Sequence, residues 1–419
     1  MKVLFAANPE KAHFLPMVPL AWALRTAGHE VRVACQPKFA PIVTQAGLTA
    51  VPTGRDVDLW DLMPRHPDYR GTAWRPAYGL PIPYEVAEFP EKATPEYLAE
   101  SYAAILHYWH KPACFPMIGG LVEFARAWEP DLVLWEPLCL AAPIAALASG
   151  AAHARLLWST DVFGVTREHF LRTRTAGTPD PLGDWLGAYA RKHGGEFTED
   201  LVTGQFTVDQ LPASLRLPTE LETVPLQYLP HGGPASVPNW LWRPPEKPRV
   251  ALSMGISLTD HEAGYSVAVQ DVLDHLAALD IEVVATLPDT EKAKLARIPD
   301  GVRIVPYAPL EALAATCSAV VSHGGFGTFL TTARHAVPQL CAPWDFDGPV
   351  FARRAEEQGA ALSVRADEAT GEVVANAVSR LLSEPGFATR AEALRAEIHA
   401  MPTPNELTGR LEELARKHS

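Results

Sequence analysis

The sequence predicts an α/β protein built from two Rossmann-like domains that face each other across a cleft. Short apolar strands alternate with helical segments in both halves of the chain, which is typical of parallel sheets covered by helices. Residues 231–248, between the halves, contain five prolines and indicate a stiff linker. At 419 residues the chain is also too long for one ordinary hydrophobic core.

The first half predicts a parallel sheet whose regular alternation is interrupted once. Residues 54–116 form a long irregular region rich in Pro, Trp and Tyr, and strand-like pieces lie between residues 212 and 229. Gly28 lies where the C-cap of the first long helix belongs, directly before the second strand. The predicted strands are residues 2–6, 30–35, 48–51, 132–135 and 154–157, and the predicted helices are residues 16–27, 38–46, 117–128, 138–149 and 180–197.

The second half repeats the same alternation after the linker. Its predicted strands are residues 249–254, 281–286, 302–305, 319–321 and 338–342, with helices such as 265–279 and 310–316 between them. A last helix, residues 404–417, follows a Pro-Thr-Pro break. We therefore expect an N-terminal domain over residues 1–230, the linker over 231–248, a C-terminal domain over 249–403 and a terminal helix over 404–419.

Composition excludes several classes of protein. Hydrophobic residues make up 47% of the chain, but no run of about 18 apolar residues predicts a membrane span. The five cysteines are scattered without a Cys-x-x-Cys pair, so neither a disulfide framework nor a zinc site is expected, and the cytoplasm is the expected compartment. The net charge of −13, without clustered Lys and Arg, argues against nucleic-acid binding.

Residues 322–328, Ser-His-Gly-Gly-Phe-Gly-Thr, predict an anion site. They join an apolar strand to a helical segment, and the free N–H groups at a helix N-terminus bind phosphate groups well. Glycines let a ligand approach the backbone, Thr328 can cap the helix or bind a phosphate, and His323 adds a side-chain donor. Diphosphate binding is the interpretation we adopt, and an ordinary turn beside a buried histidine is the alternative.

His13 is the candidate general base, because it lies in the loop after the first strand. Ligands of open α/β sheets bind beyond the carboxyl ends of the strands, and imidazole titrates near neutral pH. Such a base needs an orienting carboxylate, for which Glu136 is favoured over Asp161, each closing a neighbouring strand. Helix capping is the alternative role of both acids.

The segment Trp-Asp-Phe-Asp at residues 344–347 is a second candidate ligand site. Asp347 can accept hydrogen bonds from ligand hydroxyls, and Phe346 can cover an apolar ligand face. Asp345 offers a second register, and either acid can instead cap the following helix. Asp345 and Asp347 also fit the Asp-x-Asp pattern of a metal site, but a helix end already serves the diphosphate, so no metal is expected.

The irregular region carries many aromatic residues between Trp60 and Trp109. They can pack in the core, line an apolar pocket for the acceptor, meaning the molecule that the candidate base would deprotonate, or form a docking surface for a partner protein. We assign acceptor contacts to Trp74 and Tyr78 in this region and to Trp135 and Asp161 near the candidate base.

Together these segments resemble the metal-independent glycosyltransferases with the GT-B fold, in glycosyltransferase family 1. They are most similar to actinomycete transferases that attach deoxysugars to macrolides and anthracyclines and often need a P450-like auxiliary protein. The family has two consecutive histidines where this chain has Ser322 and His323, so only His323 is carried over. The other segments that carry the resemblance are residues 19–34, 135–137, 154–158 and 255–257.

The resemblance supplies further expectations. It assigns the catalytic base to His13, returns the last helix to the N-terminal domain, and places the pyrimidine base against the loop of Tyr307 and Ala308. The expected donor-binding residues are Gly255, Ser257, Tyr307, Ala308, His323, Gly324, Gly325, Gly327, Thr328, Phe346 and Asp347.

We therefore expect an inverting, metal-independent transfer of a deoxysugar from a dTDP-sugar to a hydroxyl of a polyketide aglycone, without a cofactor. A P450-like protein on the N-terminal domain is an expected partner, and a homodimer is a further possibility. The alternatives are a nucleotide-sugar epimerase of the same fold and a non-catalytic helper subunit.

Overall fold

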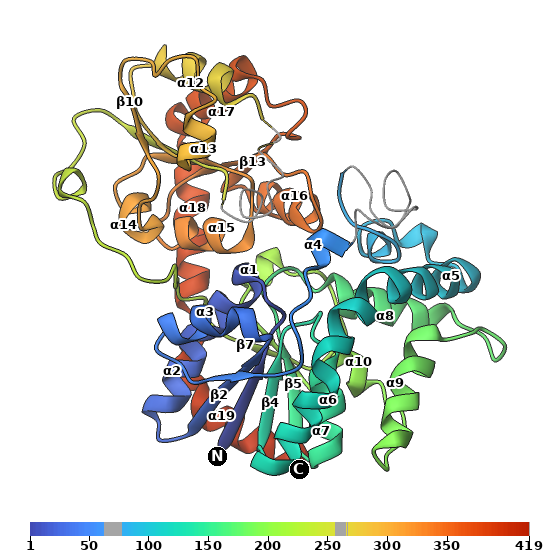
Figure 1. Ribbon diagram of the computed structural model, residues 1–419. Helices are drawn as coiled ribbons and strands as arrows, with labels where there is room; N and C mark the ends of the chain where they lie inside the picture. Colours follow the sequence, from blue (N-terminus) through green and yellow to red (C-terminus); the bar gives the residue numbers. More distant parts are fainter. Residues whose placement is uncertain (63–77, 256–264, 266, 419) are drawn as a thin grey trace.

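The computed structural model describes residues 1–62, 78–255, 265 and 267–418 of the chain. Among these residues, two sheets with only parallel strand pairs form the centres of two α/β domains, as predicted (Figure 1). No helix in these ranges is both long enough and apolar enough to cross a membrane.

The first sheet has seven strands in the order β3-β2-β1-β4-β5-β6-β7. The order reverses between β1 and β4, which lie side by side with Phe5 opposite Leu134 and Ala6 opposite Trp135. Ligands of open α/β sheets bind at such a reversal. The strands are β1 (Lys2–Ala6), β2 (Glu30–Cys35), β3 (Ala50–Pro52), β4 (Leu132–Trp135), β5 (Ala152–Leu156), β6 (Thr207–Asp209) and β7 (Thr223–Pro225).

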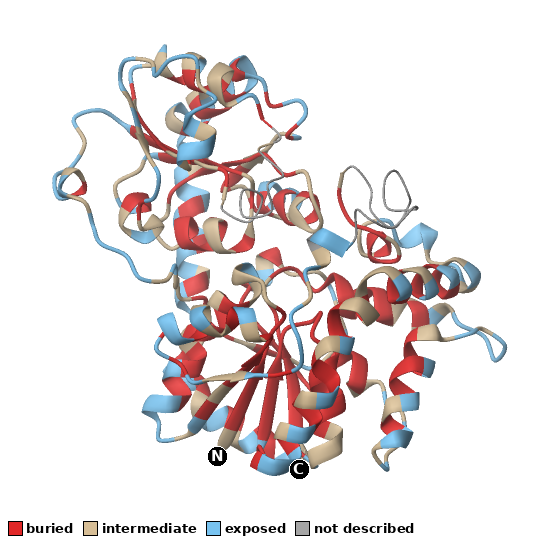
Figure 2. Cartoon of the chain, in the orientation of Figure 1, coloured by how far each residue is buried: buried red, intermediate tan, exposed pale blue. Residues whose placement is uncertain are grey.

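Alternate residues of these strands enter two hydrophobic cores, because successive side chains point to opposite faces of a sheet. Val3 and Phe5 pack with helices α2 and α19, whereas Leu4 and Ala6 pack with α6 and α7. Both faces are therefore covered, and β4, β5 and β6 in the sheet are buried along their whole length, whereas the edge strand β3 is partly exposed (Figure 2). The helices of this region are α1 (Lys11–Phe14), α2 (Val18–Thr26), α3 (Ala40–Gln45), α4 (Leu59–Leu62), α5 (Pro95–Ile105), α6 (Lys111–Trp128), α7 (Ala141–Ser149), α8 (Val162–Thr173), α9 (Pro181–Lys192), α10 (Asp200–Thr203) and α19 (Pro404–His418).

The prediction of an irregular region up to residue 116 is wrong over its last third. Helix α5 begins after its N-cap Thr94, a π-helical turn covers Leu106–His110, and α6 follows at once. The helix predicted over residues 117–128 begins earlier, at Lys111, so Pro116 lies inside α6. A proline costs a helix interior one backbone hydrogen bond, and the burial of the apolar face of α6 in the core outweighs that cost.

The second sheet has six strands in the order β10-β9-β8-β11-β12-β13 and reverses between β8 and β11. From the sequence, α16 was predicted only as the helix that follows Asp347, and β13, α13, α17 and α18 were not predicted. The strands are β8 (Arg249–Ser253), β9 (Glu282–Thr286), β10 (Val302–Val305), β11 (Ala319–Ser322), β12 (Gln339–Cys341) and β13 (Ala361–Ser363). The helices are α12 (Val269–Ala277), α13 (Asp289–Lys292), α14 (Leu310–Ala314), α15 (Phe326–Ala333), α16 (Gly348–Gln358), α17 (Gly371–Ser383) and α18 (Pro385–His399).

Helix α19 leaves the second sheet and packs beside α2 on the first (Figure 1). Leu407, Leu411 and Leu414 lie in the same core as Val3 and Phe5. The two α/β units also touch through the loop before α16, where Gly79 N donates to Trp344 O over 3.0 Å. These contacts bring the loop of Asp345–Asp347 against the first sheet.

Candidate functional site

His13 and Glu136 come together at the reversal of the first sheet. His13 lies in the short helix α1 after β1, and Glu136 directly follows β4. His13 Nδ1 lies 3.5 Å from Glu136 Oε2, and the side chains are 12% and 0% exposed. Because Nδ1 faces the carboxylate, Nε2 is the ring nitrogen left to accept a proton.

The Glu136 carboxylate is held by several donors. Oε1 accepts from Asn8 N at 3.3 Å, and Oε2 accepts from Leu138 N at 2.9 Å and from Trp158 Nε1 at 3.1 Å. Burial alone would raise the pKa of Glu136, but His13 and these donors outweigh it and lower the pKa. The carboxylate is therefore charged at neutral pH.

The same pair shifts the pKa of His13 in the opposite direction. Burial alone would lower the pKa of His13, but the charge of Glu136, with smaller contributions from Glu10 and Asp347, raises it above its ordinary value. A raised pKa indicates that the site stabilises the imidazolium that forms when His13 takes a proton.

Trp158 covers the imidazole of His13. The two rings are stacked with centroids 4.0 Å apart and an interplanar angle of 13°. In the sequence, Trp158 belongs to a segment that carries the family resemblance, and no role was predicted for it. Its position one residue after the strand predicted over 154–157, at the edge that carries His13, was a signal that could have identified it.

At the reversal of the second sheet, His323 follows β11 and precedes α15. A Cβ on Gly255 would lie 2.5 Å from His323 Cε1, and one on Gly325 would lie 2.2 Å from Nε2. Glycine is required at both positions because the imidazole occupies the space of a side chain. Burial lowers the pKa of His323 to about 4, although the Ser253 backbone acts in the opposite direction.

The pKa of His323 changes the expected division of roles at the anion site. At neutral pH the ring is uncharged, so it can donate a hydrogen bond but supplies no positive charge. The positive potential comes from the N-terminus of α15, whose N-cap Gly325 has no side chain to occupy the first N–H groups. Gly327 and Thr328 lie in this first turn. Ser322, where the family has another histidine, accepts a hydrogen bond from Gly324 N over 3.1 Å and thereby braces the turn.

Asp347 faces the first α/β unit rather than capping α16. It is the N-cap residue of α16 but makes no side-chain capping bond. Its Oδ2 accepts a short hydrogen bond from Ser159 and one of 3.4 Å from Thr160. Burial raises the pKa of Asp347 to about 6, with Ser159 and Thr160 acting in the opposite direction. Asp345 instead accepts from Phe346 N over 2.9 Å, so the two acids have different surroundings.

Phe346 lies among aromatic side chains of the first α/β unit. Its φ of +50° is in the left-handed region, which is unusual for a bulky residue. Its ring centroid lies 6.1 Å from Trp158, 5.5 Å from Trp109 and 5.9 Å from Phe163. A strained backbone conformation of this kind persists only where surrounding contacts stabilise it, and such conformations are common at functional sites.

Two predicted acceptor residues do not have the surroundings expected of them. The Trp135 side chain is 0% exposed and lies in the core under α6 and α7, so an acceptor has no access to it. Asp161 caps α8 through Gly164 N at 2.8 Å and forms a buried ion pair with Arg155 at 2.7 Å. The acceptor contacts predicted for Trp135 and Asp161 are therefore wrong. Trp135 is a strand residue that faces the core, and Asp161 is a helix cap and ion-pair partner.

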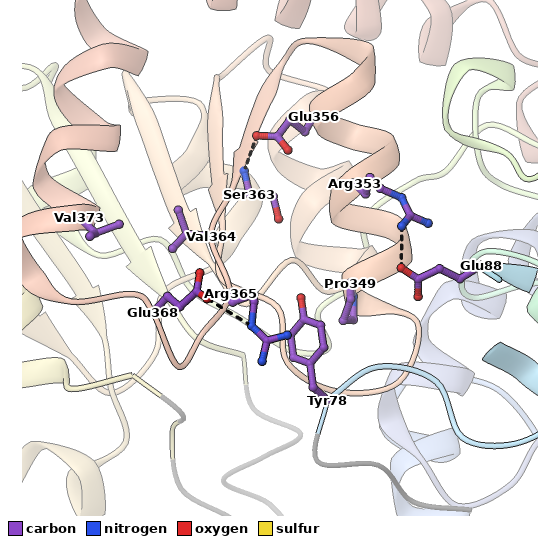
Figure 3. Close-up of a pocket in the computed structure, with 10 residues that line it drawn as sticks. All are labelled: Tyr78, Glu88, Pro349, Arg353, Glu356, Ser363, Val364, Arg365, Glu368 and Val373. Atoms are coloured by element: carbon purple, nitrogen blue, oxygen red, sulfur yellow. Dashed lines mark hydrogen bonds and ion pairs between the residues drawn. The ribbon is translucent and has the colours of Figure 1, made fainter. Parts of the chain in front are cut away.

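Tyr78 lines a pocket together with charged residues such as Arg353 and Arg365, and His13 is not among the residues that line it (Figure 3). The Arg365 guanidinium carbon lies 3.8 Å from the centroid of the Tyr78 ring. The pocket also contains the ion pair between Arg353 and Glu88, with 2.6 Å between its atoms. Tyr78 was predicted to contact the acceptor, but in the structure its ring contacts Arg365 of the second α/β unit.

The remaining predictions fall on differently placed residues. Trp74 and Ser257 lie outside the described residues. Tyr307, after β10, is 49% exposed, whereas Ala308 is buried at 5%. Of the aromatic residues between 60 and 109, Tyr84 and Tyr102 belong to the core, which was the alternative interpretation of that region. Within the described part of the chain, no group of three or more His, Cys, Asp or Glu residues could hold a metal ion.

Comparisons with known proteins give consistent matches over the whole chain. The model of the N-terminal domain of erythromycin biosynthesis protein CIII-like proteins matches residues 22–255, and the model of their C-terminal domain matches residues 270–414. A 10-deoxymethynolide desosaminyltransferase of Streptomyces venezuelae is 42% identical, with 100% of this chain and 98% of that protein covered.

Two further proteins extend the comparison. An aclacinomycin-T 2-deoxy-L-fucose transferase of Streptomyces galilaeus is 39% identical, covering 100% of this chain and 97% of that protein. The crystal structure of glycosyltransferase VinC in complex with dTDP superimposes with a TM-score of 0.88 at 37% identity, with 100% of both chains covered.

Proposed function

The chain belongs to the erythromycin biosynthesis protein CIII-like family of GT-B glycosyltransferases, and from this premise we propose that it transfers a deoxysugar from a dTDP-sugar to a hydroxyl of a polyketide aglycone. The names of its relatives support this assignment, since they describe transfer of deoxysugars to macrolide and anthracycline compounds. The observation that carries the mechanism is the contact of His13 with a fully buried, multiply hydrogen-bonded Glu136.

In the proposed reaction, Nε2 of His13 takes the proton of the acceptor hydroxyl as its oxygen attacks the anomeric carbon. Glu136 keeps Nδ1 protonated and stabilises the imidazolium, as the carboxylate of a catalytic triad does. The bond from the anomeric carbon to the diphosphate oxygen breaks on the opposite side, so the configuration inverts.

The departing diphosphate gains negative charge in this step. We assign its stabilisation to the free N–H groups at the start of α15, to the hydroxyl of Thr328 and to a hydrogen bond from neutral His323. Asp347 is assigned to the hydroxyls of the donor sugar. No step in this scheme needs a metal ion or a cofactor.

The direct test is a transfer assay with a matched histidine control. The purified chain is incubated with a dTDP-deoxysugar and a macrolactone or anthracyclinone, and glycoside and dTDP are quantified. His13→Ala should lower turnover by about 100-fold or more, the usual contribution of general base catalysis, while calorimetry shows unchanged dTDP binding. His275→Ala, on the exposed surface of α12, is the control. Retention of more than about a tenth of turnover by His13→Ala would remove the base assignment.

A further inference from the structure

Trp158 makes two separate contacts with the pair of His13 and Glu136. Its indole is stacked on the imidazole at 4.0 Å, and its Nε1 donates to Glu136 Oε2 over 3.1 Å. That oxygen is the one that lies 3.5 Å from His13 Nδ1. One side chain therefore limits both the tilt of the imidazole and the position of the carboxylate oxygen that faces it.

These two contacts constrain different motions. A stacked ring restricts rotation of the imidazole out of its plane, which keeps Nδ1 directed at the carboxylate and Nε2 directed away from it. The indole N–H and His13 Nδ1 both face Oε2 of Glu136. The hydrogen bond from the indole partly neutralises the charge on that oxygen, so His13 experiences less of it. Removing the N–H should therefore strengthen the attraction between Glu136 and the imidazolium.

The same segment also touches the loop of the second α/β unit. The Trp158 and Phe346 rings are 6.1 Å apart at 27°, and the neighbouring Ser159 and Thr160 donate to Asp347. Three consecutive residues after β5 thus contact the base on one unit and the candidate sugar-binding loop on the other. A change in that loop can reach His13 through Trp158.

We propose that Trp158 is a positioning residue that aligns His13 and Glu136 for proton transfer and links their alignment to the loop of Phe346 and Asp347. The proposal rests on the proposed role of His13 as the base. Trp158 itself takes no proton and contacts no reacting atom. Its effect is exerted on the orientation and the basicity of His13.

The two contacts can be separated by substitution. Trp158→Phe keeps an aromatic face for His13 and Phe346 but removes the N–H that Glu136 accepts, whereas Trp158→Leu removes both. The control is Trp185→Phe, the same chemical change in α9, where the indole is buried in the same hydrophobic core and its ring lies against Phe115 and Tyr189. Thermal unfolding of all variants monitors the fold.

The decisive measurement is the pH dependence of kcat/KM for the acceptor. In Trp158→Phe we expect kcat to fall about tenfold, because Oε2 loses one hydrogen bond that holds it opposite Nδ1, and we expect the midpoint of the acidic limb to move to higher pH. Trp158→Leu should lose more in kcat, because the imidazole is then also free to tilt. Trp185→Phe should keep both kcat and the midpoint.

A purely structural role for Trp158 predicts lower stability with an unchanged midpoint, and that result would overturn the proposal. Equal effects of Trp158→Phe and Trp185→Phe would do the same. Nuclear magnetic resonance can measure the pKa of His13 without an activity assay. The histidine ring signal that is absent from the spectrum of His13→Ala is assigned to His13 and is followed as a function of pH. If His13→Ala is active, the base assignment fails. If it is inactive while the Trp158 variants titrate and turn over as the wild type, only the positioning role fails.

Discussion

Replacing Glu136 with Gln would test the electrostatic part of the mechanism while preserving its shape. The carboxylate is surrounded by donors, namely Asn8 N on Oε1 and Leu138 N, Trp158 Nε1 and His13 Nδ1 on the Oε2 side. A glutamine must direct its NH₂ group at one side. Facing Asn8 leaves the Asn8 N–H without its acceptor and turns the amide's own N–H groups toward that donor, and the opposite orientation opposes three donors.

The first orientation is therefore favoured, and it lets the glutamine oxygen still accept from His13. The tautomer with Nε2 free is retained, but the negative charge is lost. Each unsatisfied buried donor costs about 1–3 kcal/mol of folding stability. Losing the charge removes stabilisation of the imidazolium in the transition state, and we expect kcat to fall about 100-fold, within the range of general base effects.

The direction of the pH effect follows from the burial of His13. Burial lowers its pKa and Glu136 raises it, so Glu136→Gln leaves the lowering effect dominant. The acidic limb of kcat/KM should therefore move to lower pH, opposite to the shift expected for Trp158→Phe. Stopped assays across pH 5–9, with dTDP release as the measure, would show it. A limb that stays in place or moves to higher pH would refute the electrostatic role of Glu136.

Three further predictions concern the donor and the partner. Chelation with EDTA should leave turnover unchanged, because the diphosphate is assigned to a helix end, Thr328 and His323; loss of activity that Mg²⁺ restores would instead assign Asp345 and Asp347 to a metal. The KM for the donor should rise as pH falls through about 6, where Asp347 takes up its proton, and Asp347→Asn should show a high KM with no such pH dependence. A cognate P450-like protein should raise the activity of the purified chain through the region between residues 60 and 109; full activity of the chain alone, with no increase on adding that protein, would contradict the partner proposal.

Most of the first sheet could be predicted from the sequence because its strands have strong local signals. Residues 3–6 are an apolar run, residues 30–35 alternate polar and apolar side chains before ending in Ala-Cys, and the structure has β1 over 2–6 and β2 over 30–35. The helices between residues 95 and 116 were missed because the Pro, Trp and Tyr content of residues 54–116, which includes Pro112 and Pro116, predicts one irregular region. Prolines are weak boundaries when one lies in the first turn and the packing of the helix compensates for the other.

The candidate site was predictable at the level of loops but not of side-chain surroundings. The loop after β1 and the residue after β4 were identified, and the structure brings His13 and Glu136 together there. Sequence pattern could not distinguish Asp161 as a cap and ion-pair partner from Asp161 as an acceptor contact, because both need an acid at a strand end. Nor could it show that Trp158 stacks on His13, since stacking depends on rotamers set by tertiary packing.

The two halves of the site occupy equivalent positions in the two sheets. In each sheet the order reverses between the first and fourth strands of that sheet, β1 and β4 in one and β8 and β11 in the other. His13 and Glu136 follow the first pair of strands, and an imidazole beside a carboxylate suits removal of a proton. Gly255 and His323 follow the second pair, and no acid lies directly after β11. A carboxylate there would repel a diphosphate, and a side chain at Gly255 would collide with His323. The residue that follows the fourth strand of each sheet therefore sets the charge that its position favours. Glu136 favours a positive imidazolium, whereas His323 in place of an acid leaves the second position suited to a negative diphosphate.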